Sequence, residues 1–282
     1  MKENGILTLV ATPIGNLGDM SERAINTLRE ADIIACEDTR NSIRILNHFE
    51  IKTKMTSYHE FNKIEKGEEL CDLLVEGKNI ALITDAGTPG ISDPGEELVR
   101  MCLDRGIRVT TVPGPAAFVN AAIISGMPCR RLAFEAFLPK DKKEHERVMN
   151  EIKNETRTIV IYEAPHHLKK TLTELHKLLG DERKIAIVRE LTKIHEEVHR
   201  FTLGEACTYY ESTEPRGEYV LVIEGKSKEA QLEEKKAAFE GVSLEEHMKI
   251  YMDKGYNKKE AMKLVAHDRN VSKREIYNEL NK

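Results

Sequence analysis

Apolar and polar positions alternate over about the first 115 residues in the pattern of an α/β domain. Short apolar runs rich in β-branched residues predict buried strands at 6–12, 32–37, 54–59, 79–85 and 108–113. Amphipathic runs between them predict helices at 19–31, 39–49, 62–77 and 94–106. Strands that alternate with helices imply a mostly parallel sheet, because each helix carries the chain back to the same edge.

Capping residues predict where two of these helices begin and end. Asp19 is the expected N-cap of the first helix, with Glu22 three residues later. Asp93 is the expected N-cap of the fourth helix, and Pro94 its first residue. Gly106 should lie just past the end of that helix.

The second half of the chain predicts a different sheet. A helix of small residues at 113–128 leads into strands at 132–138, 158–164, 184–191, 197–203 and 217–225, with helices at 141–154, 166–179 and 204–211. The strands near 184–203 follow one another without a helix, so this sheet should be mixed. We therefore predict α/β domains at 1–116 and 117–225, a charged linker at 226–242 and a helical tail at 243–282.

The tail carries three pairs of residues at the spacing of helix N-terminal capping boxes: Ser243 with Glu246, Asn257 with Glu260, and Ser272 with Glu275. Three short helices are expected, and the last, NVSKREIYNEL, resembles the recognition helix of a helix-turn-helix. Two interpretations stay open: a nucleic-acid module, or a helical appendage that packs on the body. The near balance of charge in the tail favours the second.

Composition narrows the class of protein. The net charge is −5, so a polyanion partner would have to be met by local basic patches. The five cysteines are scattered and include no CxxC pair, which is typical of a reducing cytosol and predicts a cytoplasmic location. No apolar run approaches the roughly 20 residues of a membrane span, and no signal peptide is expected.

The loop TDAGTPGISDPG, residues 84–95, follows a predicted strand and precedes a predicted helix. Ligands of α/β sheets bind at the carboxyl ends of strands, and a helix N-terminus there favours an anion. Two more Pro-rich loops, 11–19 and 112–117, follow other strands of the same predicted sheet. The pattern is neither GxxxxGK[ST] nor GxGxxG. A nucleotide, a dinucleotide or an amino-acid-bearing nucleoside would fit these loops.

Seven ordered motifs carry a resemblance: ATPIGNLGDMSERA, CEDTR, LITDAGTPGISDPG, VPGPAA, YEAPHHL, VRELTKIHEE and RGEYVLVIEG. Together they span about residues 5–225 and resemble the tetrapyrrole-methylase superfamily, in particular its ribosomal RNA branch. The resemblance implies two α/β domains of the tetrapyrrole methylase type, with S-adenosylmethionine in the cleft between them and usually a homodimer. It also implies methylation of a cytidine ribose 2′-oxygen in the decoding region of small-subunit (16S) ribosomal RNA.

Ten residues are assigned to the cofactor. Five belong to the loop 84–95: Asp85, Gly87, Thr88, Ser92 and Asp93. The matching family loops imply five more: Pro13, Pro115, Ala116, Ala117 and Tyr162. S-adenosylmethionine carries no phosphate, so a rigid cleft rich in backbone groups suits it without a phosphate clamp.

Methyl transfer to a ribose hydroxyl needs in-line alignment, and a nearby base helps because the hydroxyl is a poor nucleophile. Four carboxylates at strand ends are candidates: Glu37, Asp38, Glu163 and Glu190. We favour Glu37 or Asp38 as the catalytic residue. The alternative for each is a surface or helix-capping carboxylate, and Asp38 is placed to cap the helix that follows it.

Two basic stretches could contact RNA phosphates. Arg40 and Arg44 lie one helical turn apart, although solvated arginines are an equal alternative. Lys140, Lys142 and Lys143 belong to LPKDKKEHER, where acidic residues dilute a run that is denser in the RNA branch.

The segment HEEVH, residues 195–199, matches the HExxH signature of zinc proteases. That chemistry needs a helix with both histidines on one face and a third ligand. Val198, Phe201 and Thr202 favour a strand instead, so no metal site is assigned. The adjacent His166 and His167 are interpreted as a helix start after Pro165.

The sequence thus favours an S-adenosylmethionine-dependent RNA 2′-O-methyltransferase with small ribosomal subunit RNA as its partner. Three rivals are weighed against it. The first is a methyltransferase of the same superfamily that acts on a corrin or porphyrin precursor, and the basic stretch argues against it. The second is a non-enzymatic nucleic-acid-binding protein that acts through its tail, and the three cleft loops argue against it. The third is a zinc hydrolase.

Overall fold

The computed structural model describes residues 3–227, 229–231, 233, 237, 239 and 241–280. The chain forms two compact units, Met1–Lys153 with Thr158–Glu224, and Asn154–Arg157 with Gly225–Lys282. The strands of both sheets belong to the first unit. Among the described residues, no helix combines the length and apolarity needed to cross a bilayer.

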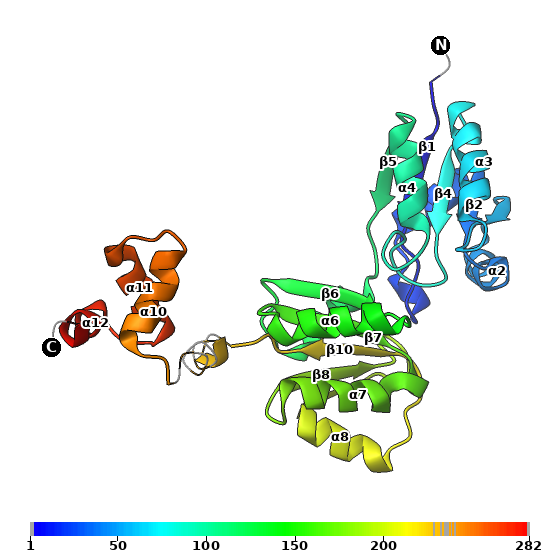
Figure 1. Cartoon of the computed structure of the whole chain (residues 1–282). Coiled ribbons are helices and arrows are strands. Elements are labelled where there is room, and N and C mark those ends of the chain that lie inside the picture. The colour runs from blue at the N-terminus through cyan, green and yellow to red at the C-terminus, as the bar shows by residue number, and fades with distance from the viewer. Residues whose placement is uncertain are drawn as a thin grey trace. The chain divides into compact units, whose positions relative to one another are not determined.

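The first sheet is parallel throughout, as predicted, with strand order β3-β2-β4-β1-β5 (Figure 1). Its strands are β1 (Ile6–Val10), β2 (Ile33–Cys36), β3 (Met55–Ser57), β4 (Ile80–Ile83) and β5 (Arg108–Val112). Helices α1 (Glu22–Glu30), α2 (Thr39–His48), α3 (Lys63–Val75) and α4 (Gly95–Asp104) connect them.

Side-chain alternation along β4 explains the two cores of this domain. Ile80 and Leu82 pack with residues of α3 and α4, whereas Ala81 and Ile83 pack with residues of α1 and α2. All four are buried, as expected for a central parallel strand that is covered on both faces. The carboxyl ends of the strands meet at one edge, which gathers the loops that follow them.

The second sheet is mixed, as predicted, with order β6-β7-β10-β8-β9 (Figure 1). Only β6 and β7 pair in parallel; the other neighbours are antiparallel. Its strands are β6 (Leu132–Phe137), β7 (Thr158–Glu163), β8 (Lys184–Arg189), β9 (Glu197–Thr202) and β10 (Tyr219–Ile223). One face packs on α5 (Ala117–Ser125), and the other on α6 (Lys142–Asn154), α7 (Pro165–Leu179) and α8 (Leu203–Ser212).

The prediction that Asp19 caps α1 is wrong. Ser21 is the N-cap, and its hydroxyl accepts a hydrogen bond from the Ala24 amide at 3.1 Å. Asp19 instead ends a 3-10 turn (Leu17–Asp19) that Asn16 caps. Two polar residues capable of capping lie close together here, and the one at the correct spacing from the first helical amides prevails.

The predicted start of α4 is also displaced by one residue. Pro94 is the N-cap and Gly95 the first helical residue, so Asp93 lies outside the helix. Gly106 lies just past the end, as predicted, with a left-handed φ of +67°.

Within its residues 241–280, the second unit forms the helices α10 (Leu244–Asp253), α11 (Lys258–Asp268) and α12 (Lys273–Leu280). All three expected capping pairs form. Leu244, Met248, Val265 and Ile276 belong to a core that these helices share among themselves. The predicted linker at 226–242 falls partly outside the described residues and stays a prediction.

The turn between α11 and α12 is four residues long, and Asn270 in it has a φ of +52°. Arg269, in the same turn, donates to the carbonyls of Val242 and Ser243 and to His247 Nδ1. This contact holds the turn against the start of α10. Helix-turn-helix motifs also join two helices by a turn of about three to four residues, so the tail keeps this as a prediction.

Candidate active site

A cavity of about 520 Å³ lies in the first unit and is lined by residues from both sheets. One wall comes from the loops that follow the strands of the first sheet: Ile14, Glu37, Thr84–Thr88, Ile91–Asp93 and Ala116–Phe118. The other wall comes from the second sheet: Phe137, Tyr162–Pro165, Val188, Leu191 and Glu218–Val220. The volume is in the range of small-molecule and cofactor sites.

The carboxylate of Asp93 fixes the shape of the loop 84–95. It accepts hydrogen bonds from the amides of Gly90 at 2.9 Å, Ile91 at 3.0 Å and Gly95 at 2.8 Å. Gly90 and Ser92 adopt left-handed φ values of +85° and +65° to close this turn. The expectation of an anionic ligand at the start of α4 is therefore not supported, because Asp93 already occupies those amides.

Gly87 joins this loop to the loop at 11–19. It pairs with Thr12 through two backbone hydrogen bonds of 2.9 and 3.1 Å. Its φ is +85°, and a Cβ at this position would lie 3.3 Å from Ile14 Cγ2. Thr88 donates from its hydroxyl to the Pro115 carbonyl at 2.9 Å, which adds the third loop. The prediction that these three loops gather at one edge is confirmed.

Eight of the ten residues assigned to the cofactor line the cavity: Asp85, Gly87, Thr88, Ser92, Asp93, Ala116, Ala117 and Tyr162. Pro13 and Pro115 do not, although Pro115 accepts the hydrogen bond from Thr88. Asp85 accepts from the Asp38 amide at 3.2 Å and from Asn41 Nδ2 at 2.9 Å, so it also ties the loop to the start of α2.

The two favoured catalytic candidates differ in their surroundings. Glu37 lines the cavity and is half-buried. Burial raises its pKa above the usual value, and the nearby carboxylates of Asp85 and Asp93 raise it further. A carboxylate with a raised pKa is the stronger base, so the environment of Glu37 suits proton abstraction.

The Asp38 carboxylate binds groups of the helix that follows it. It caps α2 by accepting from the Arg40 amide at 2.8 Å, and it pairs with the Arg40 guanidinium at 2.7 Å. The Arg40 contacts lower the pKa of Asp38 to about 2. The capping alternative for Asp38 is confirmed, and Asp38 is not among the residues that line the cavity.

The other two candidate bases are also held by hydrogen bonds. Glu163 lines the cavity but is buried, with its carboxylate accepting from the Thr171 hydroxyl and from the Ala164 amide. Burial alone would raise the pKa of Glu190, but the Glu218 amide and the Lys193 ammonium outweigh it and lower the pKa. Neither carboxylate is as free to accept a proton from substrate as Glu37.

The predicted RNA-contacting side chains are exposed and do not line the cavity. Arg44 is exposed on α2, and Arg40 is exposed beside Asp38. Lys140, Lys142 and Lys143 are exposed around the start of α6. This corner is held in place by His145, whose ring nitrogens lie 3.1 Å from the Pro139 carbonyl and 3.0 Å from Glu174 Oε2.

The HEEVH segment does not form the helix that a zinc protease needs. Its residues from Glu197 onward belong to β9, while His195 precedes the strand. The two histidines therefore share no helical face. No group of three metal-ligating side chains occurs within the described part of the chain. His166 and His167 lie in the first turn of α7 after Pro165, as predicted.

The charge of the cavity was not anticipated from the sequence. Five acidic residues are among its lining residues, Glu37, Asp85, Asp93, Glu163 and Glu218, whereas no lysine or arginine is. Glu218 was missed, although its motif RGEYVLVIEG was noticed. The signal that could have found it is its position directly before β10, at a strand end that faces the cavity.

The residues present fit S-adenosylmethionine. Its sulfonium and ammonium cations outnumber its one carboxylate, and acidic lining residues favour a ligand of net positive charge. Its adenosine is neutral and its adenine ring is flat, which suits a wall that includes Ile14, Ala116 and Phe118. An acidic cavity without a lysine or arginine would disfavour a nucleoside phosphate in the same place.

Comparison with known proteins places the chain in a family. Residues 7–207 match the family model of tetrapyrrole (corrin/porphyrin) methylases. Relatives called "Ribosomal RNA small subunit methyltransferase I" are 48% identical in Halalkalibacterium halodurans and 46% identical in Bacillus subtilis. The matches cover 98% and 97% of this chain, and 94% and 93% of those proteins.

A relative with the same description from Thermotoga maritima is 44% identical. The match covers 99% of that protein but only 79% of this chain. Among solved structures, a diphthine synthase has a TM-score of 0.63 at 12% identity, covering 81% of this chain and 94% of its own. A uroporphyrin-III-C-methyltransferase from Thermus thermophilus has a TM-score of 0.56 at 18% identity. That match covers 82% of this chain and 98% of the solved one. At such identities these two show the fold, and with the family model and the close relatives they establish that this chain belongs to the tetrapyrrole methylase family.

Proposed function

We propose that this chain transfers a methyl group from S-adenosylmethionine to the ribose 2′-oxygen of a cytidine in small-subunit ribosomal RNA. The observation that carries the proposal is the 48% identity, over nearly the full chain, to a relative described as a ribosomal RNA small subunit methyltransferase. The cavity supports it with an acidic wall for a cationic cofactor and a half-buried glutamate beside that wall.

The cofactor, when bound, supplies an electrophilic methyl group, and the chain supplies position and a proton acceptor. The loop 84–95 holds its shape through Asp93 and the Thr12–Gly87 pairing, so the cofactor side of the cavity is preset. Glu37 accepts the 2′-hydroxyl proton at its carboxylate as the oxygen attacks. Phe118, Phe137 and Val220 add apolar side chains to the lining of the cavity.

Two properties of the assembly follow from the family resemblance. We propose that the protein is a homodimer and acts in the cytoplasm, where ribosomal subunits are built. Arg40, Arg44, Lys140, Lys142 and Lys143 are proposed to meet RNA phosphates outside the acidic cavity. The helix-turn-helix of the second unit is proposed to add a further RNA contact.

The test is to incubate the protein with methyl-labelled S-adenosylmethionine and unmethylated bacterial small subunits, and then map the label by nuclease digestion and mass spectrometry. Label on the 2′-oxygen of one cytidine is the expected result. If the cofactor binds but subunits stay unlabelled, the proposal fails. The substrate would then be sought among corrin and porphyrin precursors, in keeping with the family's description.

A further inference from the structure

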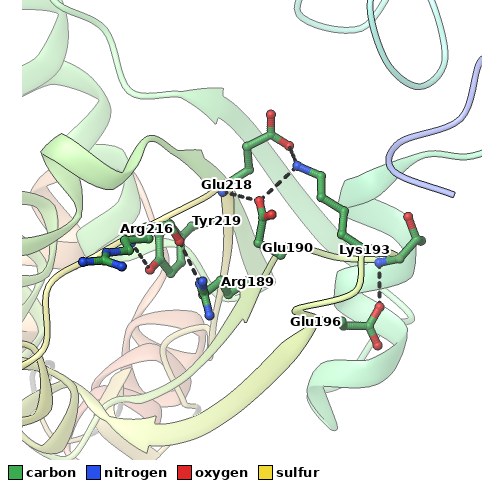
Figure 2. A network of polar contacts seen from close by, with 8 residues as sticks. Arg189, Glu190, Lys193, Glu196, Arg216, Glu218 and Tyr219 are labelled. Atoms are coloured by element: carbon green, nitrogen blue, oxygen red, sulfur yellow. Dashed lines mark hydrogen bonds and ion pairs between the residues drawn. The ribbon is translucent and has the colours of Figure 1, made fainter.

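Two of the motifs singled out in the sequence meet at the edge of the cavity. VRELTKIHEE supplies Glu190 and Lys193, and RGEYVLVIEG supplies Glu218. Figure 2 shows the Lys193 ammonium between the two carboxylates, 3.0 Å from Glu190 Oε1 and 2.8 Å from Glu218 Oε2. Glu190 also accepts from the Glu218 amide at 2.9 Å, which locks the two segments together.

The backbone around Lys193 is held in an uncommon conformation. Glu190 and Thr192 have φ values of +50° and +67°, and neither is glycine. The Thr192 amide donates to the Glu196 carboxylate at 2.6 Å, which closes the turn (Glu196 is labelled in Figure 2). Such conformations persist only where neighbours enforce them, and they gather at functional sites. The loop therefore presents Lys193 in one fixed place.

That place is the rim of the cavity. Leu191 and Glu218 line the cavity; Lys193 lies two residues after Leu191, and its ammonium is 2.8 Å from Glu218 Oε2. A Cβ on Gly15 would lie 2.5 Å from Lys193 Cγ, so the lysine stem crosses the loop at 11–19 where that loop borders the cavity. The cation thus stands where loops from the two sheets come together.

The charge of the cavity indicates which ligand the Lys193 ammonium would bind. The residues that line the cavity include five acids and no lysine or arginine, so the cavity disfavours a phosphodiester. A nucleotide whose ribose enters the cavity must leave its two flanking phosphates at the rim. The Glu218 side chain is 80% exposed and can move away, whereas Lys193 is 29% exposed and held by its stem.

We infer that Lys193 binds an RNA backbone phosphate beside the target nucleotide, and that this phosphate displaces Glu218 from the ammonium. The inference rests on the proposed function, because it takes RNA as the substrate. Glu190 stays on the ammonium and keeps the loop in place. While no RNA is bound, the Glu218 carboxylate occupies the place at the Lys193 ammonium that the phosphate would take. Glu218 therefore competes with the substrate.

Opposite effects of two substitutions test this exchange. Affinity for unmethylated small subunits is measured over a range of salt concentrations, with S-adenosylhomocysteine present to prevent turnover. Lys193→Met should weaken binding severalfold and reduce the slope of log affinity against log salt by about 1, while Lys193→Arg restores both. Glu218→Gln should tighten binding severalfold, because it frees the ammonium.

A purely structural ion pair predicts a different result. Lys193→Met and Glu218→Gln would then weaken subunit binding together, with the salt slope unchanged, and this outcome would overturn the inference. Glu218→Gln binding no tighter than wild type would also overturn it. Lys169→Met is the matched control, because Lys169 pairs with Glu214 at 3.3 Å and neither residue lines the cavity.

Wild-type methylation of the subunit is measured in the same preparation. If the wild type methylates no ribosomal RNA, the proposed function fails. If it does and the variants miss the expected pattern, only the role of Lys193 fails.

Discussion

The two walls of the cavity are held by different interactions. The loop 84–95 keeps its shape through backbone amides that donate to Asp93 and through the pairing of Gly87 with Thr12. The opposite rim is held by the Lys193 ammonium between two carboxylates. Backbone hydrogen bonds cannot be exchanged without remodelling the loop, whereas a partly exposed ion pair can trade one anion for another. The loop 84–95 therefore suits a preset ligand site, and the Lys193 ion pair suits exchange with a second anion.

The largest effect is expected from removing Glu37, the proposed base on the wall that contains the loop 84–95. Glu37→Gln should lower kcat by roughly 10²- to 10⁴-fold, with cofactor affinity nearly unchanged. Burial and the neighbouring carboxylates raise the pKa of Glu37, so the wild-type rate should fall as pH drops through a value above the usual 4.5. Below that pKa the carboxylate is protonated and cannot accept a proton.

Single-turnover rates across pH measure both effects. The acid limb should disappear in Glu37→Gln. Asp38→Asn is the control, because the amide oxygen can still cap α2 and Asp38 does not line the cavity. A wild-type rate in Glu37→Gln, or a larger loss in Asp38→Asn, would move the catalytic role away from Glu37.

A second substitution breaks the preset backbone of the same wall. Gly87→Val should weaken S-adenosylmethionine binding roughly 10- to 100-fold, because a β-branched residue is strained at a φ of +85° and its Cβ would crowd Ile14. Calorimetry measures the affinity. Gly180→Val is matched for strain, since Gly180 has a φ of +87° with no heavy atom within 4 Å of an added Cβ. Equal cofactor affinities in the two variants would contradict the claim that the backbone of the loop 84–95 shapes the cofactor site.

The proposed contact with RNA phosphates can be tested at the three lysines near the start of α6. Changing Lys140, Lys142 and Lys143 together to Gln should reduce subunit affinity roughly tenfold and the salt slope by about 2 to 3, with cofactor binding intact. Filter binding at several salt concentrations measures this. The control triple, Lys63, Lys66 and Lys78, lies on and beyond α3 and lines no part of the cavity. An unchanged slope would remove the α6 lysines from the interface.

Removal of the tail should have the smallest effect. Deleting 241–282 should spare cofactor binding and lower activity on subunits by roughly tenfold or less, because one of several contacts to the same substrate is lost. Full activity of the truncated protein would make the tail an appendage.

The sequence predicted what depends on local pattern. Both sheets and the three loops at the edge of the first sheet follow from period, β-branching and the position of Gly and Pro. The helix start at Ser21 was missed because two nearby side chains satisfy the same capping rule, and spacing to the first free amides decides between them.

The chemistry of the site depended on contacts that no local pattern encodes. Glu37 and Asp38 are adjacent in the sequence, yet one faces the cavity and the other binds Arg40. Glu190 lies at a strand end like the other candidate bases, but its carboxylate already accepts hydrogen bonds from the Lys193 ammonium and the Glu218 amide. Glu218 is 28 residues away along the chain, so only the pairing of β10 with β8 brings it there.

Asp93 also bears on which metabolites the cavity rejects. Loop amides that lead into a helix commonly bind phosphate, but here a carboxylate within the loop fills them. Adenosine triphosphate shares its adenosine with S-adenosylmethionine, yet carries a polyanion where the cofactor carries a cation. It would meet Asp93, Asp85 and Glu37 instead of free amides. The loop 84–95 should therefore bind S-adenosylmethionine in preference to adenosine triphosphate.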